Sequence, residues 1–586
     1  MGAATGRLAE PEERSPDRDP CSAQIVIGDR SDETTSQRTK DKNRERCGCP
    51  YMRPIGSANA GRSSGVSVPS RALLVSASVP THMLERYVKK ILAARVYDVA
   101  IESPLEAASL LSQRVGNHVL FKREDKQPVF SFKLRGAYNK ICQLSDEERA
   151  RGVVTASAGN HAQGVALAAA QLGIRAHIVM GVNTPDIKIN AVHGRGAKII
   201  LHGDGYDDAA THARMLEAEH GYTYVHPFDD PDVIAGQGTV GVEILRQFTG
   251  PLHAIFVPVG GGGLIAGIAA YVKYVRPTTK IIGVEAEGSA CLAAALREKR
   301  RVRLPAETLD IFADGVSVAQ IGEEPFRIAR EHVDEVITAT TDEICAAIKD
   351  AFDETRSIME PAGALALAGL KTYVQRTGIK GETLVAIMSG ANVNFDRLRH
   401  ISERADIGEG REVVLAVTIP ERPGSFRRFC RTIGKRNVTE FNYRFSDATN
   451  AQVFVGLSVA PGDDRAKILA SLGGAQYAVQ DMTDNEMAKL HVRHMVGGRA
   501  PIDDEVIYRF QFPERPGALM RFLNVVGERW NISMFHYRNH GSAWGRVLVG
   551  FQVPKKDRKT LAGYFDEIGY LYWDETANPA YQRFLR

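Results

Sequence analysis

Hydrophobic and polar residues follow two different periods along the chain, and the changes between them mark the predicted elements. From residue 118 onward, short runs rich in Val and Ile, such as HAIFVPV and TKIIGV, are followed by longer amphipathic stretches. The short apolar runs favour buried strands, and the longer stretches favour helices. Strands that alternate with helices predict parallel βαβ units, with ligands bound at the carboxyl ends of the strands. We therefore expect an α/β catalytic core with a parallel sheet over residues 83–400.

Changes of pattern mark both ends of this core. Helical periodicity begins near Met83, in MLERYVKKILAARVYDV, and the residues before it are rich in Arg, Ser, Asp, Glu, Gly and Pro. A segment of that composition buries too little apolar surface to fold, so residues 1–82 are expected to be a disordered extension. After the core, the polar, glycine-bearing segment ISERADIGEGREVV predicts a linker over residues 401–411.

The C-terminal part of the chain repeats itself. VTIPERPGSFRRF matches FQFPERPGALMRF at an offset of 93 residues, and the likeness continues through Tyr443 and Tyr537 after one inserted residue. Each copy predicts a strand, a Pro-Gly turn, a helix and two strands, hence two small α+β modules at 412–500 and 501–586. The helix start after each turn would receive an amino-acid carboxylate, and the two tyrosines would cover that ligand. The alternative is that the modules serve only assembly.

Charge and composition narrow the class of protein. With 74 basic and 70 acidic residues among 586 and no long block of one sign, a nucleic-acid partner is not expected. No run approaches the ~20 apolar residues of a membrane helix, so a membrane is not expected either. The ten basic and ten acidic residues among the first 60 argue against a transit peptide. We expect a cytoplasmic protein, with organellar import left open.

The cysteines give little sign of chemistry. Their number is seven, odd and small for the length of the chain, which is typical of a reducing compartment. Cys47 and Cys49 form a C-x-C pair without a second Cys or His pair at zinc-site spacing. No metal site is therefore expected.

The first candidate for catalysis is Lys133, in SFKLRGAY. It follows Ser131 and Phe132 at the start of a predicted helix, where burial and the positive helix end would disfavour its ammonium form. A lysine with a lowered pKa can form a Schiff base with a carbonyl compound. Because a lone lysine at a helix start is usually a solvated surface residue, this interpretation depends on the neighbouring loops.

Three loops after predicted strands complete the candidate site. In SAGNHAQG, backbone N–H groups at a helix start would hold a carboxylate, and the Asn160 amide would donate to a phenolic oxygen. The four glycines of GGGGL, residues 260–264, let the backbone wrap a phosphate because no Cβ stands in the way. In SGAN, the Ser389 hydroxyl would face a pyridine nitrogen. Each loop taken alone could be an ordinary turn.

The glycine loop also has a second interpretation. Gly261, Gly263 and Ala266 form a nominal G-x-G-x-x-A, and Glu285 ends a predicted strand 24 residues after the first of them. This spacing is typical of a dinucleotide site, as in a nucleotide-dependent oxidoreductase. Such an enzyme would leave Lys133 and the other loops without a role, so we rank it well behind.

The four motifs together resemble those of the fold type II pyridoxal phosphate (PLP) enzymes. SFKLRGAY, SAGNHAQG, GGGGL and SGAN, followed by two regulatory-type repeats, resemble the biosynthetic threonine dehydratase (threonine deaminase) family over residues 84–586. The resemblance implies a two-lobed PLP core, two ACT-like regulatory domains and a homotetramer. It also implies a lyase that converts L-threonine, with L-serine as a second candidate substrate, to 2-oxobutanoate and ammonia in isoleucine biosynthesis. Isoleucine would inhibit and valine would oppose it, as allosteric effectors.

The resemblance further implies a role for each residue of the site. Lys133 would bind the cofactor covalently and take the α proton of the substrate. The other cofactor-binding residues would be Phe132, Asn160, Gly260, Gly261, Gly262, Gly263, Leu264 and Ser389, and the substrate-binding residues Ser157, Ala158, Gly159 and His161. A neutral serine hydroxyl, in place of an acid, leaves the cofactor ring a weaker electron sink, which favours β-elimination over transamination.

The nearest alternative is a serine racemase or serine dehydratase with the same core. Racemisation requires a second acid–base group on the opposite ring face, which in serine racemases is a serine at the position of Ala158. An alanine methyl group cannot carry a proton, and those enzymes generally lack the paired C-terminal modules. Threonine dehydratase is therefore the favoured interpretation.

Overall fold

The computed structural model describes residues 80–586, except 421–424, 435, 437, 444–448, 460–464, 495–502, 514–517, 527–528 and 539–542. The expected N-terminal extension, 1–82, lies almost wholly outside the described residues, as do the Pro-Gly turns of both repeats. The described residues belong to one compact unit, Ser76–Arg586. Among them, no helix has the length and apolar character needed to cross a membrane.

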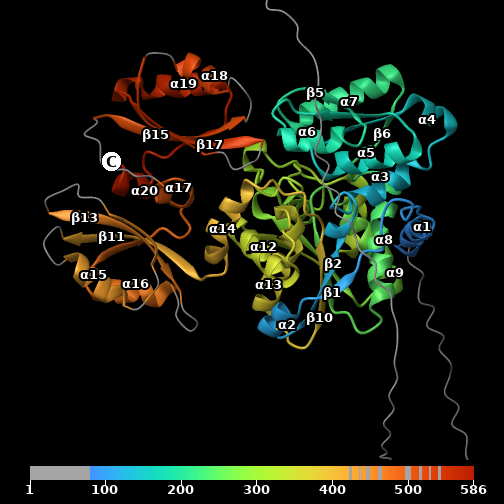
Figure 1. Cartoon of the computed structure of the whole chain (residues 1–586), viewed down its shortest axis with the longest axis horizontal. Coiled ribbons are helices and arrows are strands. Elements are labelled where there is room, and N and C mark those ends of the chain that lie inside the picture. Colours follow the sequence, from blue (N-terminus) through green and yellow to red (C-terminus); the bar gives the residue numbers. More distant parts are fainter. Residues whose placement is uncertain are drawn as a thin grey trace, which may run out of the picture. The chain divides into compact units, whose positions relative to one another are not determined.

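The larger sheet of the core has six strands. Their order is β1 (Leu105–Ala107), β2 (His118–Arg123), β10 (Thr383–Met388), β7 (Ala254–Pro258), β8 (Lys280–Ala286) and β9 (Glu335–Ala339). All neighbours pair in parallel except β1, which runs antiparallel to β2 (Figure 1). The ligand-binding ends of β7 and β10, adjacent in the sheet, therefore lie at one edge.

Helices cover both faces of this sheet because successive side chains of a strand point to opposite sides. In β7, Ala254 and Phe256 pack against α2 (Ser109–Val115), α12 (Thr341–Thr355) and α13 (Pro361–Thr377). Ile255 and Val257 face the other side. The helices on that side are α1 (Pro80–Leu92), α8 (Pro231–Gln247), α9 (Gly263–Val275), α10 (Cys291–Glu298) and α11 (Glu323–His332). Both faces being buried explains why the strands are continuous apolar runs.

The smaller lobe has its own parallel sheet. Its strands are β5 (Lys198–Leu201), β4 (Ala176–Met180), β3 (Val153–Ala156) and β6 (Thr223–Tyr224), in that order. Helices α3 (Lys133–Ile141), α5 (Asn160–Leu172) and α6 (Asp186–His193) pack on one face, and α7 (Tyr206–His220) on the other; α4 (Asp146–Arg151) precedes β3. The predicted two-lobed α/β core is thus confirmed.

In its described residues, each C-terminal repeat forms a four-stranded antiparallel sheet, two helices that connect its strands, and a short helix after the last strand, α17 (Glu486–Leu490) in the first repeat and α20 (Pro579–Phe584) in the second. The first sheet has the order β12 (Val438–Tyr443), β13 (Asn450–Ser458), β11 (Glu412–Pro420) and β14 (Ala478–Asp481), with α15 (Ser425–Ile433) and α16 (Arg465–Gly474). The second has the same order, β16 (Asn531–Arg538), β17 (Trp544–Gln552), β15 (Glu505–Pro513) and β18 (Tyr572–Asp574), with α18 (Ala518–Val526) and α19 (Arg558–Ile568). The identical topology confirms two α+β modules. The second helix, the fourth strand and the short last helix of each were missing from the prediction.

The segment expected as a linker, 401–411, is largely helical. It lies in α14 (Arg397–Gly408), whose Ile401 and Ala405 join the hydrophobic cluster of α12 and α13. Its Arg404 is not solvated, since the side chain is 6% exposed and pairs with Asp342 of α12. Ion pairing therefore explains why a buried arginine occurs in the helix that follows the core.

Candidate active site

Lys133 is the first residue of α3 and is half-buried. Its Nζ donates to the carbonyl oxygen of Pro227 at 3.2 Å and lies 5.5 Å from the ring centroid of Phe132. Burial lowers the pKa of Lys133 to about 8, and the nearby Glu360 carboxylate acts in the opposite direction. At pH 7 about one-tenth of this amine is therefore unprotonated, far more than of an ordinary lysine, and a nucleophile or a base requires that form.

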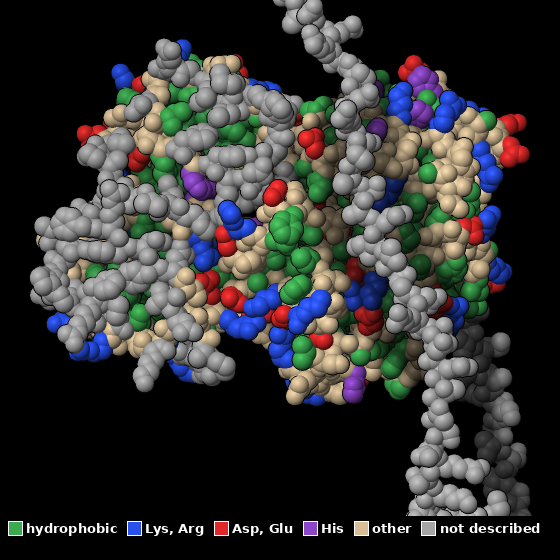
Figure 2. Space-filling model, viewed as in Figure 1, with side chains coloured by type: hydrophobic (Ala, Val, Ile, Leu, Met, Phe, Trp, Pro, Cys, Tyr) green, Lys and Arg blue, Asp and Glu red, His purple; other side chains and the backbone are tan. Residues whose placement is uncertain are grey.

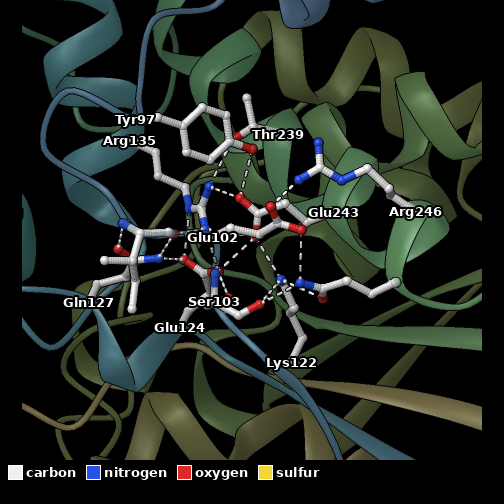
Figure 3. A network of polar contacts seen from close by, with 12 residues as sticks. Tyr97, Glu102, Ser103, Lys122, Glu124, Gln127, Arg135, Thr239, Glu243 and Arg246 are labelled. Carbon is white, nitrogen blue, oxygen red and sulfur yellow. Dashed lines mark hydrogen bonds and ion pairs between the residues drawn. The ribbon is translucent and has the colours of Figure 1, made fainter.

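A buried network of charges anchors the helix that carries Lys133 (Figure 3). Arg135, one residue beyond Leu134, donates to Glu124 at 2.8 Å and to Glu243 at 2.6 Å, and Lys122 donates to Glu243 at 2.6 Å. All four charged side chains are fully buried. Two cations and two anions balance one another, so no charge is left uncompensated. The network ties α3 to β2 and α8 and so fixes the start of α3.

The SAGNHAQG loop connects β3 to α5, which begins at Asn160. The Ser157 hydroxyl accepts from the backbone N–H groups of Gly159 and Ala162, at 3.2 and 3.3 Å. The Asn160 amide donates to Glu360 Oε1 at 2.6 Å, and its oxygen accepts from Asn392 Nδ2 at 2.7 Å. Two partners therefore hold the orientation of the Asn160 amide.

His161 and Ala158 belong to the same loop. The His161 Nε2 lies 2.9 Å from the carbonyl oxygen of Val225, and burial lowers the pKa of His161 to about 3. The ring is therefore neutral and is turned toward the backbone of the smaller lobe. The His161 ring therefore does not supply a charge for a substrate carboxylate, and the groups that can bind one are backbone N–H groups at the start of α5.

The glycine loop connects β7 to α9 and has no room for side chains. Gly262 has φ +90°, in the left-handed region. A Cβ on Gly263 would lie 2.8 Å from the carbonyl oxygen of Phe228, and one on Gly260 would lie 2.9 Å from the Cα of Val316. These backbone contacts could not be relieved by moving a side chain. Leu264 is buried in the core, so it offers the site only its N–H group.

Ser389 follows β10, and backbone hydrogen bonds join its loop to the lysine loop. Phe132 N donates to Ser389 O at 3.3 Å, and Ala391 N donates to Phe130 O at 2.9 Å. The Ser389 hydroxyl is buried and donates to the carbonyl oxygen of Ala362 at 3.2 Å. Two motifs far apart in the sequence are thus brought together.

Glu360 is a functional candidate that the sequence motifs did not include. Its side chain is 6% exposed, and burial together with the nearby Asp314 carboxylate raises the pKa of Glu360 to about 7. Asp314 itself is paired with Lys188 and with Arg397, which hold its pKa well below the usual range. No motif predicts Glu360. It becomes visible only when the fold places it against Asn160 and Lys133.

The dinucleotide interpretation meets a structural objection. The Glu285 carboxylate accepts from the backbone N–H groups of Leu292 and Ala293, at 2.8 and 2.9 Å, at the start of α10. It is buried there and does not face a ribose-sized site. Among the described residues, no cluster of His, Cys, Asp and Glu has the arrangement of a metal site.

The groups present fit PLP. The lysine amine of lowered pKa suits its aldehyde, and the glycine loop at a helix start suits its phosphate. The Asn amide suits its phenolic oxygen, and the buried Ser hydroxyl suits its ring nitrogen.

On the face drawn in Figure 2, basic and acidic side chains lie interspersed. This mixed surface differs from the basic stripe that binds nucleic acids.

Family models and relatives agree with this site. The model for pyridoxal-phosphate dependent enzymes matches residues 96–390, and the model for the C-terminal regulatory domain of threonine dehydratase matches 403–492 and 496–585. The chain is 56% identical to the biosynthetic L-threonine dehydratase IlvA of Burkholderia multivorans, over 85% of this chain and 99% of that protein. It is 52% identical to the chloroplastic biosynthetic threonine dehydratase of Arabidopsis thaliana, over 83% and 82%.

Solved structures give the same picture for the catalytic core. The processed form of threonine deaminase isoform 2 from Solanum lycopersicum aligns with a TM-score of 0.54 at 53% identity, covering 55% of this chain and 94% of that one. Maize serine racemase aligns with a TM-score of 0.51 at 32% identity, covering 54% and 95%. The predicted family and cofactor are thereby confirmed. The chain belongs to the biosynthetic threonine dehydratase family, the PLP-dependent lyases that carry C-terminal regulatory domains.

Proposed function

We propose that the chain converts L-threonine to 2-oxobutanoate and ammonia as the committed step of isoleucine biosynthesis. The observation that carries this proposal is Lys133, a half-buried amine with a pKa of about 8 that opens α3 beside the glycine, asparagine and serine loops. The relatives that cover most of the chain are named biosynthetic threonine dehydratases.

Each residue has a separate task in this reaction. PLP, when bound, supplies the electron sink that weakens the Cα–H bond of the amino acid. Lys133 would hold the cofactor covalently, and its Nζ, when neutral and free, would accept the α proton of the substrate. The N–H groups of residues 260–264 would hold the phosphate, and the buried hydroxyl of Ser389 would face the ring nitrogen without protonating it.

Glu360 is proposed to position Asn160. Its Oε1 accepts from Asn160 Nδ2 at 2.6 Å, while Asn392 donates to the amide oxygen, so the second Nδ2 hydrogen is aimed by two fixed partners. That hydrogen would be donated to the phenolic oxygen of the cofactor. A carboxyl with a pKa near 7 also accommodates a proton near neutral pH, which limits the negative charge beside the site.

Substrate binding and reaction outcome follow from the SAGNHAQG loop. The α-carboxylate would be held by backbone N–H groups at the start of α5 and in the loop before it, other than those of Ser157 and Gly159, which donate to the Val179 carbonyl and to the Ser157 hydroxyl. Ala158 places a methyl group where an acid–base residue would be needed to return a proton to the opposite face. Elimination without racemisation is the expected chemistry, and L-serine is a second candidate substrate.

Regulation and assembly are proposed on the strength of the two regulatory-domain matches. Isoleucine would inhibit and valine oppose it by binding the modules at 412–500 and 501–586, in a cytoplasmic homotetramer. Tyr443 and Tyr537 belong to β12 and β16, and their side chains lie outside the described residues. Their role as ligand covers stays a prediction.

The test uses the absorption spectrum of the purified enzyme before and after borohydride reduction. Lys133→Ala should lose the visible band of the bound cofactor and essentially all formation of 2-oxobutanoate. Lys126→Ala, which removes an exposed lysine of the same region, is the matched control and should keep both. Deamination at the wild-type rate by Lys133→Ala would refute the assignment.

A further inference from the structure

A small cavity lies where α14 meets the two C-terminal modules. Its volume is about 60 Å³, and its lining includes Arg397 and Arg404 of α14, Glu486 of α17 (Glu486–Leu490) and Arg546 of β17. One water needs roughly 10–15 Å³ on this measure, so the space suits a ligand of about four or five non-hydrogen atoms. None of the residues assigned to the catalytic site lines it.

Two of the three arginines have hydrogen-bonding capacity left over. Arg397 is 5% exposed, and its Nη1 donates to the carbonyl oxygen of Phe312 at 3.0 Å and to Asp314 at 3.2 Å. Its Nη2 is buried and has no hydrogen-bond partner within the described part of the chain. The guanidinium of Arg546 forms no hydrogen bond or ion pair with a described residue. Burial and the nearby Arg509 lower the pKa of Arg546 to about 10.

The carboxylates around the cavity are already engaged. Glu486 accepts from Arg404 at 2.7 and 3.0 Å and pairs with Lys489 at 2.6 Å. The Asp310 carboxylate accepts from the backbone N–H of Phe312 at 2.7 Å. A buried guanidinium with N–H groups left unsatisfied destabilises the fold, so an anion that accepts from Arg397 Nη2 and from Arg546 would stabilise the folded chain.

We propose that this cavity binds a small oxyanion, the size of phosphate or of a short carboxylate, between Arg397 and Arg546. Guanidinium groups present parallel N–H donors that match the oxygens of both anions, and such charge-assisted bonds are the strong ones. The site would join the catalytic part of the chain to the second module through one bound ion.

The test is isothermal titration calorimetry on the full-length holoenzyme, with sodium phosphate and sodium acetate as separate probes. Sodium chloride keeps the ionic strength constant, because screening alone would otherwise change the heat. We expect one saturable site per chain. Tighter binding of phosphate would identify an inorganic phosphate site, and tighter binding of acetate would identify a carboxylate site.

Three variants test whether the measured heat of anion binding arises at this cavity. Arg546→Met should weaken the preferred anion at least tenfold, whereas Arg521→Met, an exposed arginine of the same module, should not change its affinity. Glu486→Gln removes a negative charge from the cavity and should raise the affinity several-fold. The proposal is overturned if neither anion binds above the chloride background, or if Arg546→Met and Glu486→Gln both bind as the wild type does.

Discussion

Replacing Glu360 with Gln should change how the stability of the cofactor-free enzyme depends on pH. In that form Lys133 is a free amine and Glu360 has a pKa of about 7, against 4.5 for an ordinary glutamate. A carboxyl whose pKa is raised by folding destabilises the folded state progressively as pH rises from its pKa in the unfolded chain to its pKa in the folded chain. The difference between 4.5 and about 7 corresponds to a loss of at most roughly 3 kcal/mol in the free energy of unfolding above pH 7.

Gln keeps the size and the oxygen that accepts from Asn160 but cannot ionise. The midpoint of thermal unfolding of Glu360→Gln, relative to wild type, should therefore rise between about pH 4.5 and 7 and then level off. For a domain of this size the rise is on the order of 5 °C, lessened by the lost attraction to Lys133. Differential scanning calorimetry of both proteins at closely spaced pH values measures it.

Lys133→Met provides the opposite pH trend as a control. Folding lowers the pKa of Lys133 from 10.5 to about 8. The buried ammonium group therefore destabilises the folded state fully below pH 8, and this destabilisation vanishes as pH approaches 10.5. The stabilisation by Lys133→Met should therefore be largest below pH 8. If the midpoint difference for Glu360→Gln stayed flat between pH 4.5 and 7, the raised pKa of Glu360, and with it the account of this site, would be wrong.

Three other predictions concern the helix anchor, the reaction and its regulation. Arg135→Met leaves Glu124 and Glu243 without their main partner, and should cost about 3–5 kcal/mol of stability and weaken cofactor retention, measured by thermal unfolding and by the visible absorption band. Wild type should convert L-serine without accumulating D-serine on chiral chromatography; abundant D-serine would show an acid–base group on the opposite face. Isoleucine should raise the threonine concentration for half-saturation, with a coupling of about 1–3 kcal/mol, and a chain ending at residue 410 should lose this response. Equal inhibition of both chains would assign the modules to assembly.

The catalytic loops were predictable because local sequence fixes their chemistry. A run of glycines before a helix, as in residues 260–264, is needed wherever backbone must approach a phosphate, whatever surrounds it. In this chain the structure explains why glycine is required, since the backbone of Phe228 and Val316 leaves no space for a side chain at Gly263 and Gly260. The strand and helix order followed in the same way from the periods of the apolar residues.

Glu360 and Arg135 could not be predicted because their roles depend on long-range contacts. Glu360 lies 200 positions from Asn160 in the chain, and its pKa is raised by burial and by Asp314 from another segment. Arg135 belongs to the SFKLRGAY motif, but only the fold shows that its partner Glu243 lies in α8. From sequence alone a charged residue is predicted to be exposed to solvent, because charged side chains are rarely buried without a partner, and the partner is known only from the fold.

Long-range contacts also decide the structure of residues 401–411, the segment expected as a polar linker. Arg404 and Asp342 are each polar and read as surface or linker positions, but they pair with each other, and Glu486 and Lys489 of the first module join them. The segment between the catalytic core and the modules is therefore a helix held by ion pairs and by Ile401 and Ala405 in the core. An effector that shifts the first module relative to α14 must break or rearrange these pairs, and partly buried pairs of this kind resist gradual deformation. A rigid connection of this type transmits a change of state, which a flexible linker would absorb.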